Sequence, residues 1–171
     1  MLHDSDTLFD GARVRVRSFR PTDEASFVEL VTDPVATAAM GGPVENPHAL
    51  FARIASAPSP GRAAWVVVER STEQYVGHVF IRPSSLPQGV ELGFVLVPRV
   101  WGQGFASEAV TGVVEALRRA DPDLSLGATV DLENVASQRL LTRLGFRLES
   151  QEVDEDGPYL VYALGGATGA P

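Results

Sequence analysis

The sequence predicts an α/β fold with a mixed parallel and antiparallel sheet and helices on both faces. Two observations lead to this prediction. Segments with strand and helix periodicity follow one another in the order β-α-α-β-β-β-α-β-α-β-β, and a strand–glycine loop–helix–strand unit spans Val90–Val130. Such a unit forms a right-handed crossover between parallel strands. In a chain of 171 residues we expect one domain over residues 11–164, an N-terminal extension over residues 1–10 and a disordered tail over residues 165–171.

The first strand and helix are predicted by simple patterns. Arg13–Phe19 alternates arginine with valine or serine up to Ser18, the period of a half-buried strand. Pro21 then opens a helix, for which Thr22 or Asp23 supplies the cap. The apolar stripe of this helix consists of Phe27, Leu30 and Val31.

A second helix and three strands follow before the glycine loop. Asn46 occupies a cap position and Pro47 the first helical position, where proline is favoured. Trp65–Glu69 and Gln74–Ile81 predict a hairpin around a polar turn, and Val90–Val97 predicts the next strand.

The second half of the chain alternates helices and strands. After the glycine loop, apolar residues at helical spacing predict a helix that ends in two arginines, which suit the negative end of the helix dipole. Leu124–Val130 predicts a short buried strand, and Ala136–Leu144 a helix stopped by Gly145. Arg147–Val153 and Tyr159–Leu164 predict a closing pair of strands.

The glycine loop, Arg99-Val-Trp-Gly102-Gln-Gly104, is the most informative motif. Between a strand and a helix, such a loop directs backbone N–H groups and a helix N-terminus at one point, which makes an anion site. No lysine follows Gly104, which excludes a P-loop, and Ser107 replaces the third glycine of a dinucleotide loop.

Composition excludes several classes of function. The chain has no cysteine, so it has no thiol nucleophile and no cysteine-based metal site, and its three histidines lack metal-ligand spacing. The net charge of −8 argues against nucleic acid as a partner and suits a cationic acceptor such as an amine. We find no apolar run long enough for a membrane span and no signal peptide, so the expected location is the cytoplasm.

The glycine loop matches the Gln/Arg-x-x-Gly-x-Gly/Ala signature of the GNAT superfamily of N-acetyltransferases. About 30 residues downstream, Asn134-x-x-Ser137 followed by Leu144-Gly145-Phe146 resembles a second segment of that superfamily. The stretch around the glycine loop, Glu91–Val110, and the N-terminal stretch Arg13–Pro34 are similar to the RimJ/RimL-like branch. The resemblance covers roughly residues 10–164.

The resemblance implies acetyl-CoA as donor, a primary amine as acceptor, and no metal. In this family the pyrophosphate lies on the amides of the glycine loop, and the pantetheine arm inserts between the strand before the loop and the strand after the helix. Carried over, the cofactor-binding residues are Phe94, Val95, Leu96, Val97, Arg99, Gly102, Gln103, Gly104, Phe105, Ala106, Ser107, Asn134 and Ser137.

Acetyl transfer to an amine needs a neutral amine, a stabilised oxyanion and a leaving thiolate. A backbone N–H near Leu96 is the candidate oxyanion donor. Glu91, a charge on an otherwise apolar strand, is the candidate base, acting directly or through water. The alternative is that Glu91 caps the turn after Gly89 or pairs with an arginine.

The proton donor for the thiolate is less clear from the residues. Many family members carry a tyrosine seven residues after the asparagine, where this chain has Leu141. The resemblance instead places the Ser137 hydroxyl near the sulfur, against the alternative of a plain helix N-terminal residue. Asn134 has the similar alternative of a helix cap. Tyr159 and Tyr162 are alternative acids or strand residues that pack the sheet.

Two functions from different classes follow. The first is an acetyl-CoA-dependent N-acetyltransferase that works through a ternary complex, since no cysteine can carry an acetyl group. The second is a catalytically silent acyl-CoA-binding sensor, which the leucine at the tyrosine position favours. The amine, whether a protein N-terminus or a small molecule, stays open, as does the choice between monomer and homodimer.

Overall fold

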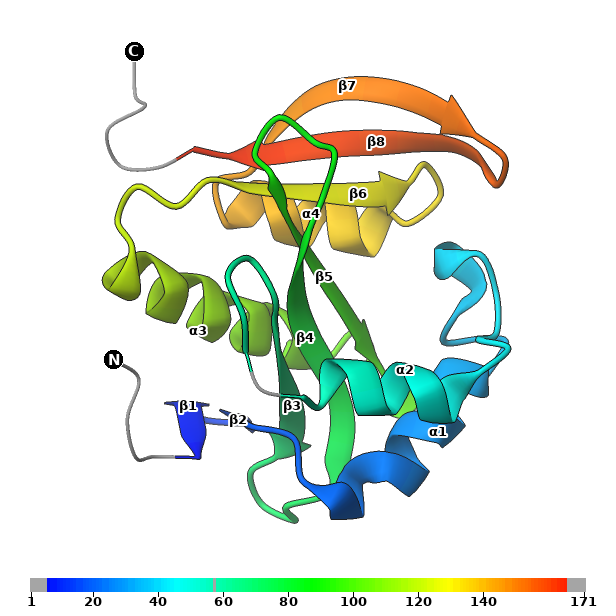
Figure 1. Cartoon of the computed structure of the whole chain (residues 1–171), viewed down its shortest axis with the longest axis vertical. Coiled ribbons are helices and arrows are strands. Elements are labelled where there is room, and N and C mark those ends of the chain that lie inside the picture. Colours follow the sequence, from blue (N-terminus) through cyan, green and yellow to red (C-terminus); the bar gives the residue numbers. More distant parts are fainter. Residues whose placement is uncertain (1–5, 57, 166–171) are drawn as a thin grey trace.

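The computed structural model describes residues 6–56 and 58–165 and contains a single sheet with helices on both sides (Figure 1). Its eight described strands have the spatial order β1-β2-β3-β4-β5-β6-β8-β7. The strands are β1 (Thr7–Asp10), β2 (Val14–Arg17), β3 (Ala63–Glu69), β4 (Tyr75–Pro83), β5 (Val90–Leu96), β6 (Leu126–Asp131), β7 (Arg147–Asp154) and β8 (Gly157–Leu164). The α-helices are α1 (Glu24–Thr32), α2 (Pro47–Ile54), α3 (Phe105–Ala120) and α4 (Val135–Arg143). Three short 3₁₀ helices are η1 (Pro21–Asp23), η2 (Ala38–Met40) and η3 (Pro98–Val100). The predicted fold class is confirmed.

The parallel pair β5–β6 is the exception in an otherwise antiparallel sheet. Among the described residues these two strands are in register only where Glu91 is opposite Gly127. Beyond that point they diverge, and Figure 1 shows β5 running away from β6. We call the resulting opening the β5–β6 gap.

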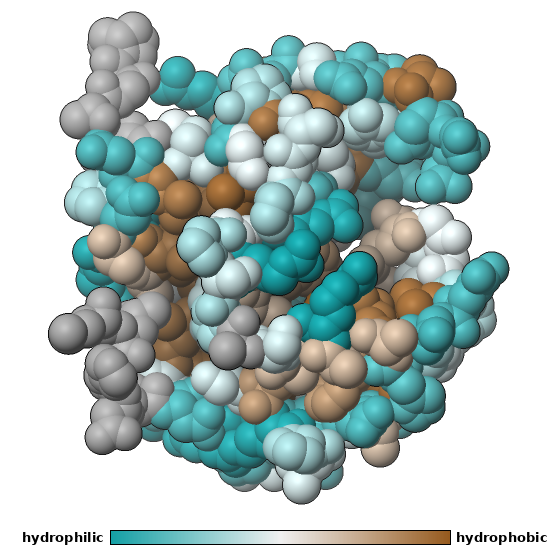
Figure 2. Space-filling view, in the orientation of Figure 1, coloured by the Kyte–Doolittle hydropathy of each residue, from teal (hydrophilic) through white to brown (hydrophobic). Residues whose placement is uncertain are grey.

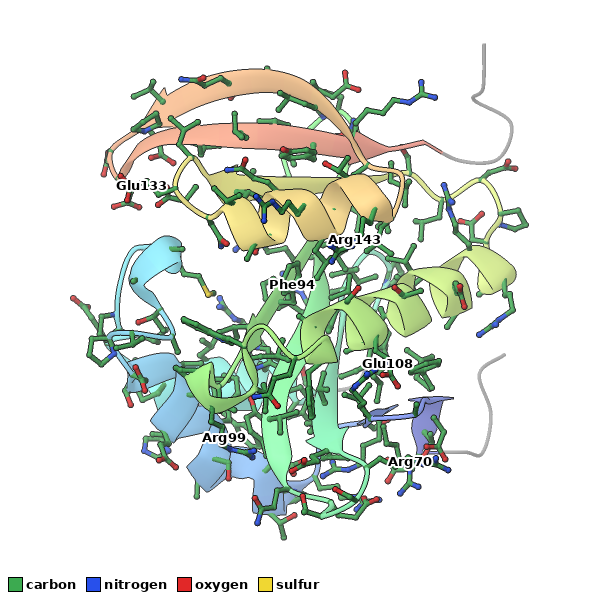
Figure 3. All side chains as sticks on the ribbon, turned by 180° about the vertical axis from the view of Figure 1, so that it is seen from behind. Arg70, Phe94, Arg99, Glu108, Glu133 and Arg143 are labelled. Carbon is green, nitrogen blue, oxygen red and sulfur yellow. The ribbon has the colours of Figure 1, made fainter. Side chains whose placement is uncertain are left out.

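The helices divide between the two faces of the sheet. Helices α3 and α4 cover the face seen in Figure 3, where they pack on the large apolar core. Helices α1 and α2 cover the opposite face, where Phe27, Val31 and Phe51 form a second cluster. Leu92 and Leu96 of β5 point into the first core, whereas Val95 points toward α1. Strand β5 therefore contributes side chains to both faces.

Local sequence signals explain why these segments begin where they do. The Asn46 side chain accepts a hydrogen bond from the Ala49 N–H at 3.2 Å, as the predicted cap of α2 should. In β3 the residues Val66, Val67 and Val68 are fully buried, since this central strand is covered on both faces.

The structure corrects the prediction for the N-terminal extension. Residues Thr7–Asp10 form an edge strand paired with β2, so the sheet begins inside the segment predicted to precede it. The ring of Phe9 lies against Gly112 of α3, so closely that a Cβ at that glycine would lie 2.4 Å from the ring. The predicted disordered tail lies outside the described residues, apart from Gly165.

The first helix is also capped differently from the prediction. The Asp23 carboxylate accepts hydrogen bonds from both terminal nitrogens of Arg17, at 2.8 and 2.9 Å, and from the Arg20 N–H at 2.7 Å. Arg17 and Asp23 are both buried, although the strand pattern placed Arg17 on the polar face. The hydrogen bond to Asp23 raises the pKa of Arg17, against the opposing effect of burial. The Asp23 side chain thus joins β2 to the start of the helix, and its bond from the Arg20 N–H belongs to a capping box on η1, whereas α1 itself has no side-chain cap.

This buried pair yields a stability prediction. Replacing Asp23 by Ala should lower the free energy of unfolding by about 3–5 kcal/mol, because it leaves the Arg17 charge buried without a partner. The exposed Arg20–Asp6 pair provides the control, and Asp6→Ala should cost less than about 1 kcal/mol. Urea denaturation of both variants measures the difference, and equal losses would contradict the prediction.

Candidate active site

The glycine loop joins β5 to α3 and stays open to solvent. Gly102 has φ of 72° and Gly104 has φ of 84°, backbone conformations that residues with a Cβ rarely adopt. A Cβ built at Gly102 would meet no atom within 4 Å. These glycines are therefore required by the backbone conformation, and not by packing within the protein. An approaching ligand finds free space there.

Side chains of the loop hold the loop itself. The Trp101 indole N–H donates to the Leu96 carbonyl at 2.8 Å, and the Gln103 side-chain amide donates to the Arg99 carbonyl at 2.7 Å. The Arg99 guanidinium points elsewhere: it reaches the Tyr75 carbonyl at 3.4 Å and lies 3.8 Å from the Glu69 carboxylate. The side chains of Arg99 and Gln103, two of the predicted cofactor-binding residues, thus bond to backbone carbonyls of the protein itself.

The first turn of α3 supplies further donors. The N–H groups of Phe105, Ala106 and Ser107 have no intrahelical partner, and Gly104 at the cap has no side chain to accept from them. Together with the helix dipole they make an anion site.

Arg13 is a loop neighbour that the sequence analysis missed. Its N–H and guanidinium both bond to the carboxylate of Glu108 in the first turn of α3, at 2.9 and 3.4 Å. This pairing offsets the one acidic charge in that turn, which would otherwise repel an anion. The guanidinium also lies 4.0 Å from the position of a Cβ on Gly104. No sequence signal joins Arg13 to Glu108, because they are 95 residues apart.

The backbone of β5 presents alternate amides to the β5–β6 gap. The Val97 N–H donates to the Val76 carbonyl at 2.9 Å, and the register places Val95 opposite His78 of β4. Because alternate residues of an antiparallel strand bond to the same neighbour, the N–H groups of Val95 and Val97 face β4. The amides of Val95 and Val97, two of the residues expected to bind the cofactor, are therefore directed at β4 and away from the gap. The N–H groups of Phe94 and Leu96 face the gap instead.

Residues of the downstream motif, Asn134 and Ser137, lie together at the gap. A cavity of about 70 Å³ is lined by Phe94, Asn134, Ser137 and Leu141. Phe94 lies between α3 and α4 in Figure 3. The Asn134 side chain accepts from the Ser137 N–H at 3.1 Å, so the predicted alternative of a helix cap is confirmed. This bond uses the backbone of Ser137, so it does not engage the hydroxyl of this cavity-lining residue.

No described tyrosine takes the place of the missing one. Leu141 is fully buried beside the gap. Tyr162 packs in the core, and Tyr159 donates its hydroxyl to Glu152 at 3.1 Å in the β7–β8 hairpin, a bond that raises the pKa of Tyr159. Neither tyrosine lines the gap, so the structure supports their alternative role as sheet residues.

A larger cavity of about 220 Å³ lies on the face covered by α1 and α2. We call it the acceptor cavity, after the amine acceptor that the sequence leads us to expect. Figure 2 shows a hollow on this face with hydrophobic residues beside it and hydrophilic residues at its edge. Met40 of η2 lines both this cavity and the gap, so the two adjoin there. His78 forms part of the wall, with Nδ1 2.8 Å from the Tyr75 hydroxyl. Burial lowers the pKa of His78 to about 3, so the ring is neutral at pH 7.

Glu91 is buried at the closed end of the gap, and both of its oxygens are engaged. One accepts from the Arg82 guanidinium of β4 at 2.9 Å, and the other from the Thr129 hydroxyl of β6 at 2.6 Å. The structure thus agrees with the alternative prediction, in which Glu91 pairs with an arginine. An amine could reach this carboxylate only by displacing one partner. Glu91 instead joins three strands at the one point where β5 and β6 are in register.

Comparison with known proteins places this arrangement in a family. The sequence profile described as an acetyltransferase (GNAT) domain matches residues 13–147, which include the glycine loop, Asn134 and Ser137. The chain belongs to the GNAT acetyltransferase family. Members of this family use acetyl-CoA and an amine acceptor. The open glycines, the helix N-terminus and the free amides of Phe94 and Leu96 fit a CoA molecule in this GNAT chain.

Individual relatives agree with the family and differ in their acceptors. An uncharacterized N-acetyltransferase, YoaA of Bacillus subtilis, is 34% identical over half of this chain and 49% of its own length, so the match spans about half of that relative. The ribosomal-protein-S5-alanine acetyltransferase of Vibrio fischeri has a TM-score of 0.75 at 16% identity, over 95% of this chain and 98% of that one. The spermidine N-acetyltransferase of Vibrio cholerae, solved with CoA and spermine, has a TM-score of 0.76 at 15% identity, over 92% of this chain and 98% of that one. At these identities the two structures show the shared fold alone.

Among the described residues of this GNAT domain, none of the helices is long and apolar enough to cross a membrane. The same residues contain no group of three or more acidic, histidine or cysteine side chains that could hold a metal ion.

The glycine loop can be tested with a matched pair of variants. Gly102 and Gly89 have φ of 72° and 71°, and a Cβ at either would meet no atom within 4 Å. Both Gly102→Ala and Gly89→Ala should therefore cost about 1–2 kcal/mol of stability from the left-handed backbone alone. Only Gly102→Ala should also weaken acetyl-CoA binding, by tenfold or more in calorimetry. Equal affinity in the two variants would remove the loop from the site.

Glu91→Gln separates the role of a base from that of an ion pair. Loss of the charge should lower the free energy of unfolding by about 1–3 kcal/mol, as for a hydrogen bond to a charged group, while kcat falls less than tenfold. Thermal denaturation and steady-state kinetics measure the two effects. A general base would show the reverse pattern, with an unchanged melting temperature and a kcat reduced on the order of 10²–10⁴-fold.

Proposed function

We propose that this protein transfers the acetyl group of acetyl-CoA to a primary amine by direct attack in a ternary complex. The observation that carries the proposal is the placement of three parts next to one another. The glycine loop opens beside the β5–β6 gap, and the gap adjoins the acceptor cavity at Met40. A donor thioester in the gap and an amine in the cavity would therefore meet without a covalent enzyme intermediate.

The proposed reaction follows from these positions. The neutral amine nitrogen attacks the thioester carbonyl carbon, a C–N bond forms, and the carbonyl oxygen gains negative charge. The Leu96 N–H, which faces the gap, stabilises this oxyanion. The C–S bond then breaks, the thiolate takes up a proton to give free CoA, and the amine loses one to give the amide. The Ser137 hydroxyl supports the sulfur, and Asn134 holds the end of α4 that carries it.

The branch and the acceptor belong to the same proposal. The resemblance to the RimJ/RimL-like branch supports a protein N-terminus, and the small size of the acceptor cavity supports a small amine. According to their names, one of the two structural neighbours acetylates a ribosomal protein and the other acetylates spermidine. Their TM-scores are nearly equal, so the fold does not decide between the two kinds of acceptor. A cytoplasmic location is proposed from the sequence alone. Sedimentation of the purified chain would decide between monomer and homodimer.

The second candidate is a catalytically silent acyl-CoA-binding sensor. Leu141 favours it, since this buried leucine stands where many family members have a tyrosine. Release of free CoA in the presence of a panel of amines, combined with calorimetry of acetyl-CoA, distinguishes the candidates. Release with any amine supports the enzyme. Tight binding of acetyl-CoA without release supports the sensor. If the protein neither binds acetyl-CoA nor releases CoA, the assignment of CoA as its ligand fails.

Ser137→Ala tests the group placed near the sulfur. We expect kcat to fall by up to roughly tenfold, the worth of one neutral hydrogen bond of about 0.5–1.5 kcal/mol. The melting temperature should be unchanged, because the bond to Asn134 uses the Ser137 backbone. Asn134→Ala is the control for helix stability and should cost about 1 kcal/mol. Unchanged kcat in Ser137→Ala would exclude the hydroxyl from the reaction.

A further inference from the structure

The acceptor cavity has an uneven distribution of charge. Its charged lining residues within the described chain are three arginines, Arg53, Arg62 and Arg82, and none is acidic. Arg82 is paired with Glu91, whereas Arg53 and Arg62 have no acidic partner among residues 6–56 and 58–165. His78 adds no charge, because its ring is neutral at pH 7. Two positive charges therefore remain uncompensated at this cavity, in a chain whose net charge is −8.

The backbone brings these arginines to one end of the cavity. The β3–β4 register pairs Ala63 with Ile81, so Arg62 lies opposite Arg82 one step further along. The Arg62 N–H donates to the Ser59 carbonyl at 2.8 Å, which fixes this position. Arg53 belongs to the last turn of α2, which covers the same face. Arg62 therefore adds an unpaired positive charge beside the Arg82–Glu91 pair, which favours a bound anion.

The other end of the cavity is where the amine would react. His78 lies four residues before Arg82 on β4 and opposite Val95 of β5, the strand whose flanking amides face the gap. Four residues of a strand span about 13 Å, and an arginine side chain covers part of that length. The cavity wall has a large apolar part that includes Val44, Leu50, Ile54 and Phe80. The volume of about 220 Å³ is below the roughly 300–1,000 Å³ of sites for drug-sized ligands.

We propose that the acceptor is a small primary amine with a carboxylate or phosphate at its other end, separated from the amine by a short apolar chain. Arg53 and Arg62 bind the anionic group, and the apolar wall holds the chain. This inference rests on the proposed acetyl transfer and names its substrate class. It differs from the expectation of a cationic acceptor, which the net charge suggested. Glu91 already neutralises Arg82 and does not line the cavity.

Amines of one length and different charge test the proposal. Release of CoA from acetyl-CoA is measured with 6-aminohexanoate, 6-aminohexyl phosphate, hexylamine and 1,6-diaminohexane. We expect kcat/KM for at least one of the two anionic amines to exceed that for the diamine by tenfold or more, within the range of charge-assisted hydrogen bonds. The ratio of the two anionic amines decides between carboxylate and phosphate. Preference for the diamine, or for a peptide N-terminus over all four, would overturn the inference.

Variants connect the preference to the arginines. The double variant Arg53→Gln, Arg62→Gln should raise KM for the preferred anionic amine tenfold or more and leave KM for hexylamine and acetyl-CoA unchanged. Arg119→Gln, an exposed arginine at the far end of α3, is the control and should change none of these values. Equal KM in the double variant and the wild type would exclude the arginines as the anion site.

Binding measurements distinguish a failure of this inference from a failure of the proposed acetyl transfer. Calorimetry of 6-aminohexanoate, 6-aminohexyl phosphate and 1,6-diaminohexane against the CoA-loaded protein requires no turnover. If no amine releases CoA, acetyl transfer fails, and tighter binding of an anionic amine than of the diamine still supports the charge assignment. If amines are acetylated but the diamine binds as tightly as either anionic amine, acetyl transfer stands and the inference fails.

Discussion

The candidate site exists because two parallel strands are held together at one end and separate at the other. Glu91 lies where they meet and bonds to Arg82 on one neighbouring strand and Thr129 on the other. If the parallel ladder continued, the amides of Phe94 and Leu96 would be used within the sheet. The point at which pairing stops therefore determines which backbone groups are free for a ligand. Glu91, a charged residue inside an apolar strand, thus joins the strands at the point where the gap begins.

The same crossover positions the rest of the site. Strand β5 ends in the glycine loop, the loop starts α3, and α3 returns the chain to β6 on the other side of the gap. The anion site at the helix N-terminus and the free amides of β5 thus lie a few residues apart in sequence. On the opposite face, β5 also contributes Val95 to the acceptor cavity. Residues of one strand consequently line both the gap and the acceptor cavity.

Sequence patterns predicted the parts of this structure that local interactions specify. The cap at Asn46, and the cap that was the alternative role of Asn134, depend on residues within a few positions, and the structure contains both. Long-range pairings were not predictable. The Arg13–Glu108 and Glu91–Thr129 contacts join residues 95 and 38 positions apart, and β1 is only four residues long. Net charge has a similar limit, because a sum over the whole chain does not say which charges surround one cavity.

The hydrogen bond from Trp101 to Leu96 gives the protein an internal optical reporter. Trp101 is half exposed beside the glycine loop, whereas Trp65, the other tryptophan of the chain, is buried in the core. Indole emission depends on solvent contact and on the hydrogen bond of the ring N–H. Occupation of the loop would alter the surroundings of Trp101 and leave Trp65 as a constant background. The fluorescence of the unlabelled chain can therefore follow the arrival and departure of a ligand at this loop in real time.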